Sequence, residues 1–371
     1  MEPKPRRLSD DEKRDWLRLI RSEHLGPITF HHILRYHHGD AAKAIAALPD
    51  MARRGGSRRV VKLAPLAAID AELKTLRKLG ASLLAWGEPG YPVRLMQLDD
   101  APPLLCAMGQ PAPDEPPGIA IVGARNASAI GQRFTRDIAA ALCGHGYAVI
   151  SGLARGIDRA AHEGALAATG RTLAFIGTGI DIVFPPENAK LQAEVAERGL
   201  LLAEMPPGTP ALAQNFPRRN RLISGASLGV LVVEAALKSG SLITARMAAE
   251  QGREVMAVPG SPLDPRCHGS NDLIRQGATL VERVDDILAV VAPQVTPARR
   301  ADPPVTETPP MQGDLDHAHA EIERLLSPSP VLVDDLIRLS GLAPAAVHMV
   351  LTERELAGRL TRHPGGKVSS A

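Results

Sequence analysis

Residues 119–131 read IAIVGARNASAIG, a short apolar run that ends at a glycine and leads into a helix start. The run is apolar on both faces and too short for a free-standing helix, so it predicts a buried parallel strand. The pattern recurs between helix-length segments, in YAVISG (147–152), TLAFIG (172–177), LLLAEM (200–205), VLVVEA (230–235), EVMAVPG (254–260) and TLVER (279–283). We therefore expect an α/β fold with an extended Rossmann-like, doubly wound and mostly parallel sheet, which SLLAW (82–86) and LLCAM (104–108) extend.

The segments on either side of this core carry other signals. Ser9 and Glu12 predict a capping box at the start of a first helix, and further helical stripes continue to Gly80. Residues 293–313 hold six prolines and no hydrophobic periodicity, which is typical of a linker. Three helix-sized pieces and a hairpin-sized tail follow, in the order of a winged helix. The predicted divisions are an N-terminal helical domain (1–80), the core (81–292), the linker (293–313) and a winged helix (314–371).

Composition limits the class of protein. Hydrophobic residues make up 44% of the chain and charged residues 23%, which is typical of a soluble globular protein. No apolar stretch approaches the roughly 20 residues of a membrane span, and the charged start lacks the apolar region of a secretory signal. We expect a cytoplasmic protein with no membrane partner. The three cysteines lie far apart, which argues against a disulfide framework or a metal clasp, and we expect no metal.

Ligands of open α/β sheets bind beyond the carboxyl ends of the strands, where helix starts offer free N–H groups. The first such loop, residues 123–131, supplies glycines, a helix-capping hydroxyl and an arginine. This spacing is not GxGxxG, and the next strand ends without an acid for a ribose, so NAD is disfavoured. A phosphate site is favoured, because an arginine can bind phosphate through two parallel hydrogen bonds. The candidate residues are Gly123, Arg125, Ser128 and Gly131.

The second loop follows the strand at 147–152 and enters another helix. Its candidate phosphate contacts are Ser151, Gly152 and Arg155. Asp158 and His162 stand four residues apart and could form an acid/base pair. The favoured interpretation is structural: Asp158 charges the helix start and His162 packs beside it.

Two more loops add cations and N–H donors. FPRRNR (216–221) is the densest cationic cluster within residues 118–292, which carry 17 Lys and Arg against 16 Asp and Glu. The segment 238–244 places hydroxyls and a glycine at a helix start, which predicts an anion-binding nest, although plain N-capping by Ser241 explains the same residues. The candidates in these loops are Arg218, Arg219, Asn220, Arg221, Lys238, Ser239, Gly240, Ser241 and Thr244.

The four loops should converge at one edge of one sheet and form a phosphate-binding crevice. The sequence has no GxxxxGK[ST] loop, no GxSxG elbow and no evident nucleophile. We therefore expect a binding protein for a phosphate backbone, with no cofactor and no catalysis.

These motifs, in this order, resemble the DprA/Smf family of DNA-processing proteins. The resemblance covers roughly residues 80–285 and includes IAIVGARNASAIG, SGLARGIDRAAHEGAL, FPRRNRLISG and VEAALKSGSLITARMAAEQGREVMAVPG; Ile130, Phe184 and Ala203 depart from the usual family residues. It implies a core that binds single-stranded DNA, forms a homodimer and loads RecA recombinase onto incoming strands in natural transformation. It also implies that the candidate residues of all four loops touch the DNA backbone. With two Trp, three Tyr and five Phe in the chain, binding should be mainly electrostatic and therefore salt-dependent.

Other functions remain open on the sequence. A nucleotide-phosphate hydrolase of the lysine-decarboxylase-like type has a related fold, but its PGGxGT-type loop is missing from VPGSP (258–262) and KSGSLIT (238–244). A transcription factor would read duplex DNA with its winged helix, but Glu353 and Glu355 on the helix near 344–356 oppose this. A protein-interaction role of the winged helix is at least as well supported. The N-terminal helices resemble a sterile-alpha-motif or helix-hairpin-helix domain, for which a structural role is favoured.

Overall fold

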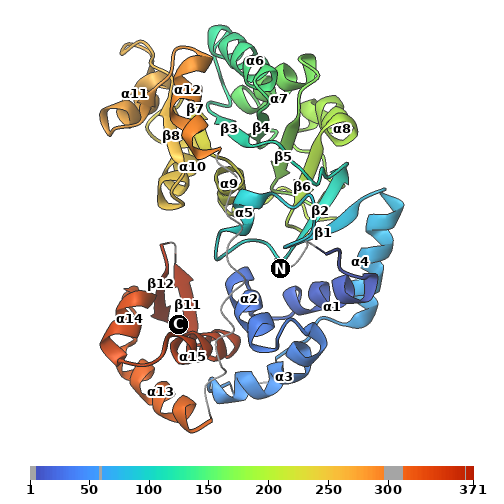
Figure 1. Ribbon diagram of the computed structural model, residues 1–371, viewed down its shortest axis with the longest axis vertical. Coiled ribbons are helices and arrows are strands. Elements are labelled where there is room, and N and C mark those ends of the chain that lie inside the picture. The colour runs from blue at the N-terminus through green and yellow to red at the C-terminus, as the bar shows by residue number, and fades with distance from the viewer. Residues whose placement is uncertain (1–5, 58–60, 296–311, 364) are drawn as a thin grey trace. The chain divides into compact units, whose positions relative to one another are not determined.

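The computed structural model describes residues 6–57, 61–295, 312–363 and 365–371. The chain divides into two units (Figure 1). The core unit takes in residues 72–298, and the terminal unit joins residues 8–71 to residues 299–371. Among the described residues, no helix combines the length and the apolarity that a membrane crossing requires.

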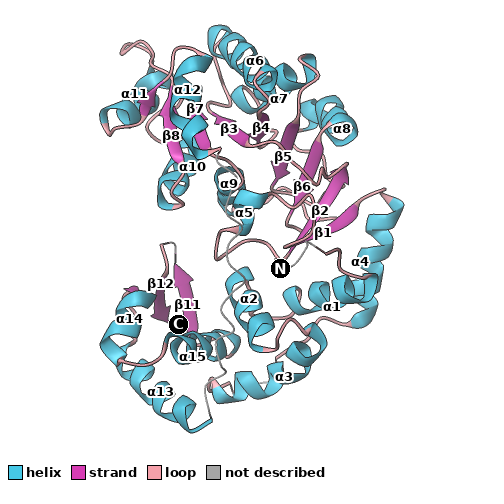
Figure 2. Cartoon of the chain, viewed as in Figure 1, coloured by secondary structure: helices cyan, strands magenta, loops and turns pink. Residues whose placement is uncertain are grey.

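The core unit is built on a nine-stranded sheet in the order β1-β2-β6-β5-β4-β3-β7-β8-β9. The strands from β3 to β9 pair in parallel, whereas β2 runs antiparallel to both β1 and β6. The predicted fold class and every predicted strand of the core are confirmed (Figure 2). The strands are β1 (Ser82–Ala85), β2 (Leu104–Gly109), β3 (Gly118–Val122), β4 (Ala148–Ser151), β5 (Thr172–Ile176), β6 (Leu200–Ala203), β7 (Gly229–Val232), β8 (Glu254–Ala257) and β9 (Thr279–Leu280).

Helices cover both faces of this sheet, which is why most of its strand residues are apolar on either face. In β3, Ile119 and Ile121 face one apolar cluster, and Ala120 and Val122 face the other. The first cluster includes side chains of α6 and α7, and the second includes side chains of α9 and α10. The helices of the core are α5 (Val93–Met96), α6 (Ala129–Gly144), α7 (Ile157–Ala167), α8 (Ala189–Arg198), α9 (Asn215–Gly225), α10 (Gly240–Glu250), α11 (His268–Arg275) and α12 (Val284–Val291), with short 3₁₀ turns at Pro186–Asn188, Pro265–Cys267 and Ala292–Gln294.

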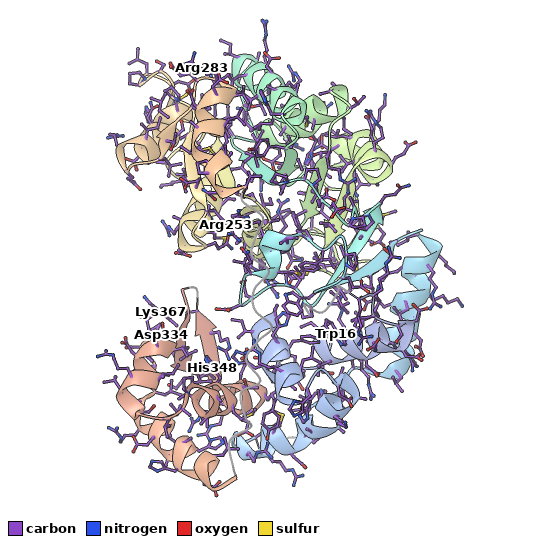
Figure 3. The ribbon with its side chains drawn as sticks, in the orientation of Figure 1. Trp16, Arg253, Arg283, Asp334, His348 and Lys367 are labelled. Carbon is purple, nitrogen blue, oxygen red and sulfur yellow. The ribbon has the colours of Figure 1, made fainter. Side chains whose placement is uncertain are left out.

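The terminal unit contains residues 8–71 of the predicted helical domain together with the winged helix. The capping box of Ser9 and Glu12 opens the first helix, as expected. Trp16 packs edge-on against Phe30, with ring centroids 5.2 Å apart, at the centre of the N-terminal helices (Figure 3). The helices on the N-terminal side are α1 (Asp10–Ile20), α2 (Pro27–Tyr36), α3 (Ala41–Arg54) and α4 (Leu66–Lys78), of which α4 passes from the terminal unit into the core.

The winged helix carries a three-stranded sheet in the order β10-β12-β11. Its first strand is only two residues long, too short for a sequence pattern to reveal, and it completes the sheet beside the predicted hairpin. The expected linker (293–313) falls largely outside the described residues. The elements are α13 (Gln312–Leu325), β10 (Val331–Leu332), α14 (Val333–Ser340), α15 (Pro344–Leu356), β11 (Leu360–His363) and β12 (Lys367–Ser370).

Candidate nucleic-acid interface

A crevice of about 810 Å³ lies beyond the carboxyl ends of β3 and β7. From β3 the chain runs through β4, β5 and β6 to one side of the sheet, and then returns to place β7, β8 and β9 on the other side. This reversal of strand order is the position where open α/β sheets leave room for a ligand. Residues from all four predicted loops line the crevice, so the expected convergence of these loops is observed.

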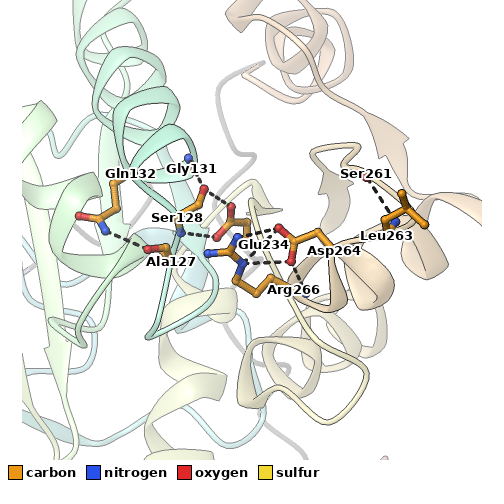
Figure 4. Close-up of polar contacts among 9 residues, drawn as sticks. All are labelled: Ala127, Ser128, Gly131, Gln132, Glu234, Ser261, Leu263, Asp264 and Arg266. Carbon is orange, nitrogen blue, oxygen red and sulfur yellow. Dashed lines mark hydrogen bonds and ion pairs between the residues drawn. The ribbon is translucent and has the colours of Figure 1, made fainter.

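The first loop presents Arg125 and is shaped by the residues behind it. Arg125 is exposed, lines the crevice and lies 5.7 Å from the ring centroid of Phe216. Ser128 caps α6 by accepting the Gly131 N–H at 2.9 Å, and the buried carboxylate of Glu234 accepts the Ser128 N–H at 2.9 Å and its hydroxyl at 2.5 Å (Figure 4). A Cβ on Gly131 would meet this carboxylate at 2.6 Å. Ser128 and Gly131 therefore fix the loop and do not line the crevice.

The candidate residues of the second loop stabilise the loop itself more than they line the crevice. Ser151 is buried and donates its hydroxyl to the Ile121 carbonyl at 2.6 Å. Asp158 is buried and accepts the N–H groups of Gly152 and Ala154 at 3.2 and 3.4 Å. Burial is the main reason that the pKa of Asp158 is raised from its ordinary value. Arg155 is exposed outside the crevice lining and pairs with Glu187.

The candidate acid/base pair is not formed. His162 is buried and its Nδ1 lies 2.8 Å from the Thr172 hydroxyl, which itself donates to the Val149 carbonyl. The hydroxyl therefore accepts from His162, so Nδ1 carries a proton. Burial lowers the pKa of His162 to about 3, with a further contribution from Arg219. This agrees with the structural interpretation of both residues.

The arginine cluster of α9 is divided among different surroundings. Arg218 is exposed beside the crevice, but Arg219 is buried and donates through Nη1 to the carbonyls of Gly152 and Phe175 at 2.5 and 2.6 Å. Burial lowers the pKa of the Arg219 guanidinium to about 10. Arg221, 12% exposed, binds the Glu204 carboxylate at 2.5 Å and lies 3.6 Å from that of Asp100. The three arginines therefore do not form the expected basic patch. Arg218 is exposed to solvent, whereas Arg219 and Arg221 stabilise the core.

Gly152 explains why Arg219 fits where it does. A Cβ at this position would lie 2.0 Å from Nη1 of Arg219, so the guanidinium occupies space that only a glycine leaves. The α9 helix is thereby fastened to the second loop, and Asn220 on the same helix lines the crevice.

The fourth loop forms the start of α10 and lines the crevice with Lys238, Ser239, Gly240 and Ser241. Ser239 is the N-cap residue: its hydroxyl accepts the Ser241 N–H at 3.3 Å and lies 2.6 Å from the Ser241 hydroxyl. Lys238 and Gly240 are exposed, and the Gly240 Cβ position has open space around it. Thr244 is buried one turn further along. The helix start thus offers its N–H groups and an adjacent ammonium to an anion in the crevice.

Arg266 and Phe216 line the crevice but were not among the candidate residues. Arg266 lies in a fifth loop, which follows β8, and its Nη2 forms an ion pair with Asp264 Oδ2 at 2.7 Å. The end of the strand EVMAVPG in the sequence could have indicated this loop. Phe216 has its ring centroid 5.7 Å from the guanidinium carbon of Arg125, 5.9 Å from that of Arg219 and 5.4 Å from the ring centroid of Phe184. With Ala211, Ala213 and Ile243 it makes much of the lining apolar, so the crevice suits a ligand with flat apolar faces as well as charge.

Three family models match this chain over most of its length. The family model described as DNA recombination-mediator protein A matches residues 82–292, the DprA-like N-terminal HHH domain matches residues 10–75, and the DprA winged helix domain matches residues 306–366. Protein Smf of Escherichia coli (strain K12) is 39% identical over 306 residues, which are 82% of this chain and 81% of that protein.

Two solved structures share the fold. The X-ray structure of DNA processing protein A from Streptococcus pneumoniae has a TM-score of 0.64 and 34% identity, and the match covers 77% of this chain and 99% of that chain. The same protein from Helicobacter pylori, whose structure concerns a single-stranded DNA binding mode, has a TM-score of 0.51 and 27% identity over 58% of this chain and 96% of that chain.

Proposed function

This chain belongs to the DprA/Smf family of DNA-processing proteins, and from that membership we propose that its crevice binds single-stranded DNA without catalysing a reaction. The observation that carries the proposal is the pairing of exposed cations with an apolar lining at one site. Arg125 and Lys238 both line the crevice, and its lining also includes Phe216 and Ile243. The Helicobacter pylori relative, a single-stranded DNA binder, supports this choice of ligand.

Single strands fit this arrangement better than duplexes do. Arg125, Lys238 and the N–H groups at the start of α10 are suited to phosphates, and the ring of Phe216 is suited to a base. An unpaired base exposes its flat face, whereas a base in a duplex is already stacked. We therefore propose that Phe216 adds a stacking contribution to the electrostatic one.

The absence of catalysis is proposed from the partners of the titratable groups. Asp158 accepts two backbone N–H groups, His162 is held by Thr172, and Glu234 is engaged by Ser128. Asp158 and Glu234 are thus engaged in fixing loops, and His162 is held against β5. A general acid or base must instead be free to reach its substrate.

Family membership also supports two finer proposals. We propose that the core forms a homodimer and that the protein delivers its bound strand to RecA recombinase during natural transformation. The cytoplasm is where these partners would meet.

The first test is the binding of a labelled oligo-dT and its duplex by the full chain, across salt concentrations. We expect salt-sensitive preference for the single strand, and loss of that preference in Arg125→Ala/Lys238→Ala. Arg133→Ala, an exposed arginine of α6 that pairs with Asp137 outside the crevice, is the matched control. Unchanged binding in the double variant would remove the crevice as the DNA site, and release of base or phosphate from nucleotides, followed by chromatography, would instead favour the hydrolase.

A further inference from the structure

Helix α15 is covered on nearly every side. In a winged helix that reads duplex DNA, the third helix lies in the major groove and must keep one face open. Here the buried residues of α15 fall on successive turns in every direction: Ala346, Val347, Met349, Val350, Leu351, Thr352, Glu353, Arg354 and Leu356. One side of α15 packs on α13, α14 and β11 of the winged helix, and the other packs on α2 and α3 of the N-terminal helices.

A charged group is enclosed in this second interface. The side chain of Glu353 has no exposed surface, and its two carboxylate oxygens lie 2.6 Å from Arg54 Nε and 2.6 Å from His319 Nε2. Arg54 comes from α3 and His319 from α13, so Glu353 links the N-terminal helices to the winged helix. A buried carboxylate that lost its cationic partner would be strongly destabilising, which makes this contact selective for one partner surface.

The backbones approach closely at the same point. A Cβ at Gly55, directly after α3, would lie 1.9 Å from the Glu353 carbonyl oxygen. Only a glycine allows α3 and α15 to meet in this way. The glycine at position 55 is therefore explained by the contact with α15, since the packing of the N-terminal helices alone does not require it.

A third group of contacts lies along α2. His348, Thr352 and Glu355 are spaced four and three residues apart, which places them on one face of α15. His348 faces the His32 ring, with centroids 4.7 Å apart, and the Thr352 hydroxyl lies 3.4 Å from His32 Nδ1. Glu355 accepts from the Thr29 hydroxyl. The face of α15 that would read a duplex therefore carries polar contacts matched to α2.

We propose that the winged helix is a docking module for the chain's own N-terminal helices, and that α15 is committed to this contact and does not read duplex DNA. The surface that α15 recognises offers the guanidinium of Arg54 from α3 to the buried carboxylate of α15. It also offers a hydroxyl and an imidazole from α2. This inference is independent of the crevice in the core.

The test uses the full chain with a site for a specific protease inserted between Val295 and Gln312. After cleavage, we expect the C-terminal fragment to stay bound to the rest of the chain in size-exclusion chromatography. Arg54→Glu, which places a second carboxylate against Glu353, should weaken this docking by about a hundredfold or more. Arg53→Glu is the matched control, because Arg53 is 72% exposed and pairs with Asp50 of its own helix.

Two further measurements keep the test decisive. Arg54→Glu/Glu353→Gln should recover part of the docking, since it removes the repulsion, and circular dichroism establishes that each variant is folded. Duplex binding should not fall when the fragment is displaced. Separation of the wild-type fragment after cleavage, equal effects of Arg53→Glu and Arg54→Glu, or loss of duplex binding together with the fragment would each overturn the proposal.

Discussion

Arg221 shows how much the role of one cation depends on its surroundings. It is 12% exposed, its nearest carboxylate belongs to Glu204, which is 13% exposed, and it donates to the Asp100 carbonyl at 2.6 Å. An arginine in this setting stabilises the fold by neutralising a nearly buried carboxylate.

Arg221→Ala should therefore act on stability before it acts on DNA. Removing one partner of a largely buried ion pair costs roughly 3–5 kcal/mol, because the carboxylate of Glu204 keeps its charge without compensation. Urea denaturation monitored by circular dichroism should show this loss, and Arg221→Ala/Glu204→Ala should recover part of it. If the Arg221→Ala variant were as stable as the wild type but bound single strands more weakly, Arg221 would instead be a DNA contact.

His162 gives the core a predictable response to acid. Its pKa is about 3 in the folded chain, against an ordinary value of 6.5 that the unfolded chain retains. As the pH falls below 6.5, the imidazole is protonated in the unfolded state but stays neutral in the folded state. The free energy of unfolding therefore decreases, by up to roughly 4–5 kcal/mol near pH 3. Denaturation at a series of pH values should give a shallower dependence for His162→Leu than for the wild type. Equal slopes would contradict the buried neutral imidazole.

At the scale of elements, the loops of the crevice are held together by glycines. Gly156, which precedes α7, has φ +71°, and a Cβ there would lie 2.2 Å from the Ala124 carbonyl oxygen of the first loop. The contact between the first two loops therefore depends on a missing side chain.

Gly156→Ala should push these loops apart. We expect a loss of more than about 1 kcal/mol in stability, since both the backbone conformation and the space forbid a methyl group, and weaker binding of oligo-dT by the folded fraction. Gly144→Ala is the matched control: its Cβ position, in the last turn of α6, has open space, and the change should be neutral or stabilising by up to about 1 kcal/mol. Thermal unfolding and fluorescence anisotropy measure the two effects, and identical behaviour of both variants would contradict the role given to Gly156.

The strands of the core could be predicted because two-sided burial leaves an unbroken apolar run. The convergence of the loops could also be predicted, because parallel strands end at one edge. The burial of the α9 arginines was not predicted, although the sequence carried a signal for Arg219. This residue shares a helix face with Leu222 and Ile223, three and four residues further along, and both are buried. The packing of α15 on α2 and α3 had no comparable signal, since a sequence shows which faces are apolar but not which surfaces pair.

For the whole molecule, DNA binding should be set by the few cations that remain near the crevice. Arg125, Arg218, Lys238 and Arg266 lie at or beside it, in a core segment with nearly balanced charge. If about four phosphates are neutralised, log K should fall with log salt at a slope near −3, taking roughly 0.7 per contact, and Arg125→Ala should reduce that slope by about 0.7. A salt-independent affinity for oligo-dT would contradict binding through the phosphate backbone.

The terminal unit has a consequence for how the protein is made. Its N-terminal helices leave the ribosome well before α15, the helix that covers them, because residues 72–298 lie between the two halves. At about 5–20 residues per second, the surfaces of α2 and α3 wait on the order of ten seconds or more for their partner. During synthesis the core can fold while the terminal unit remains half assembled, so a ribosome that stalls late would display an uncovered docking surface to chaperones and to neighbouring nascent chains.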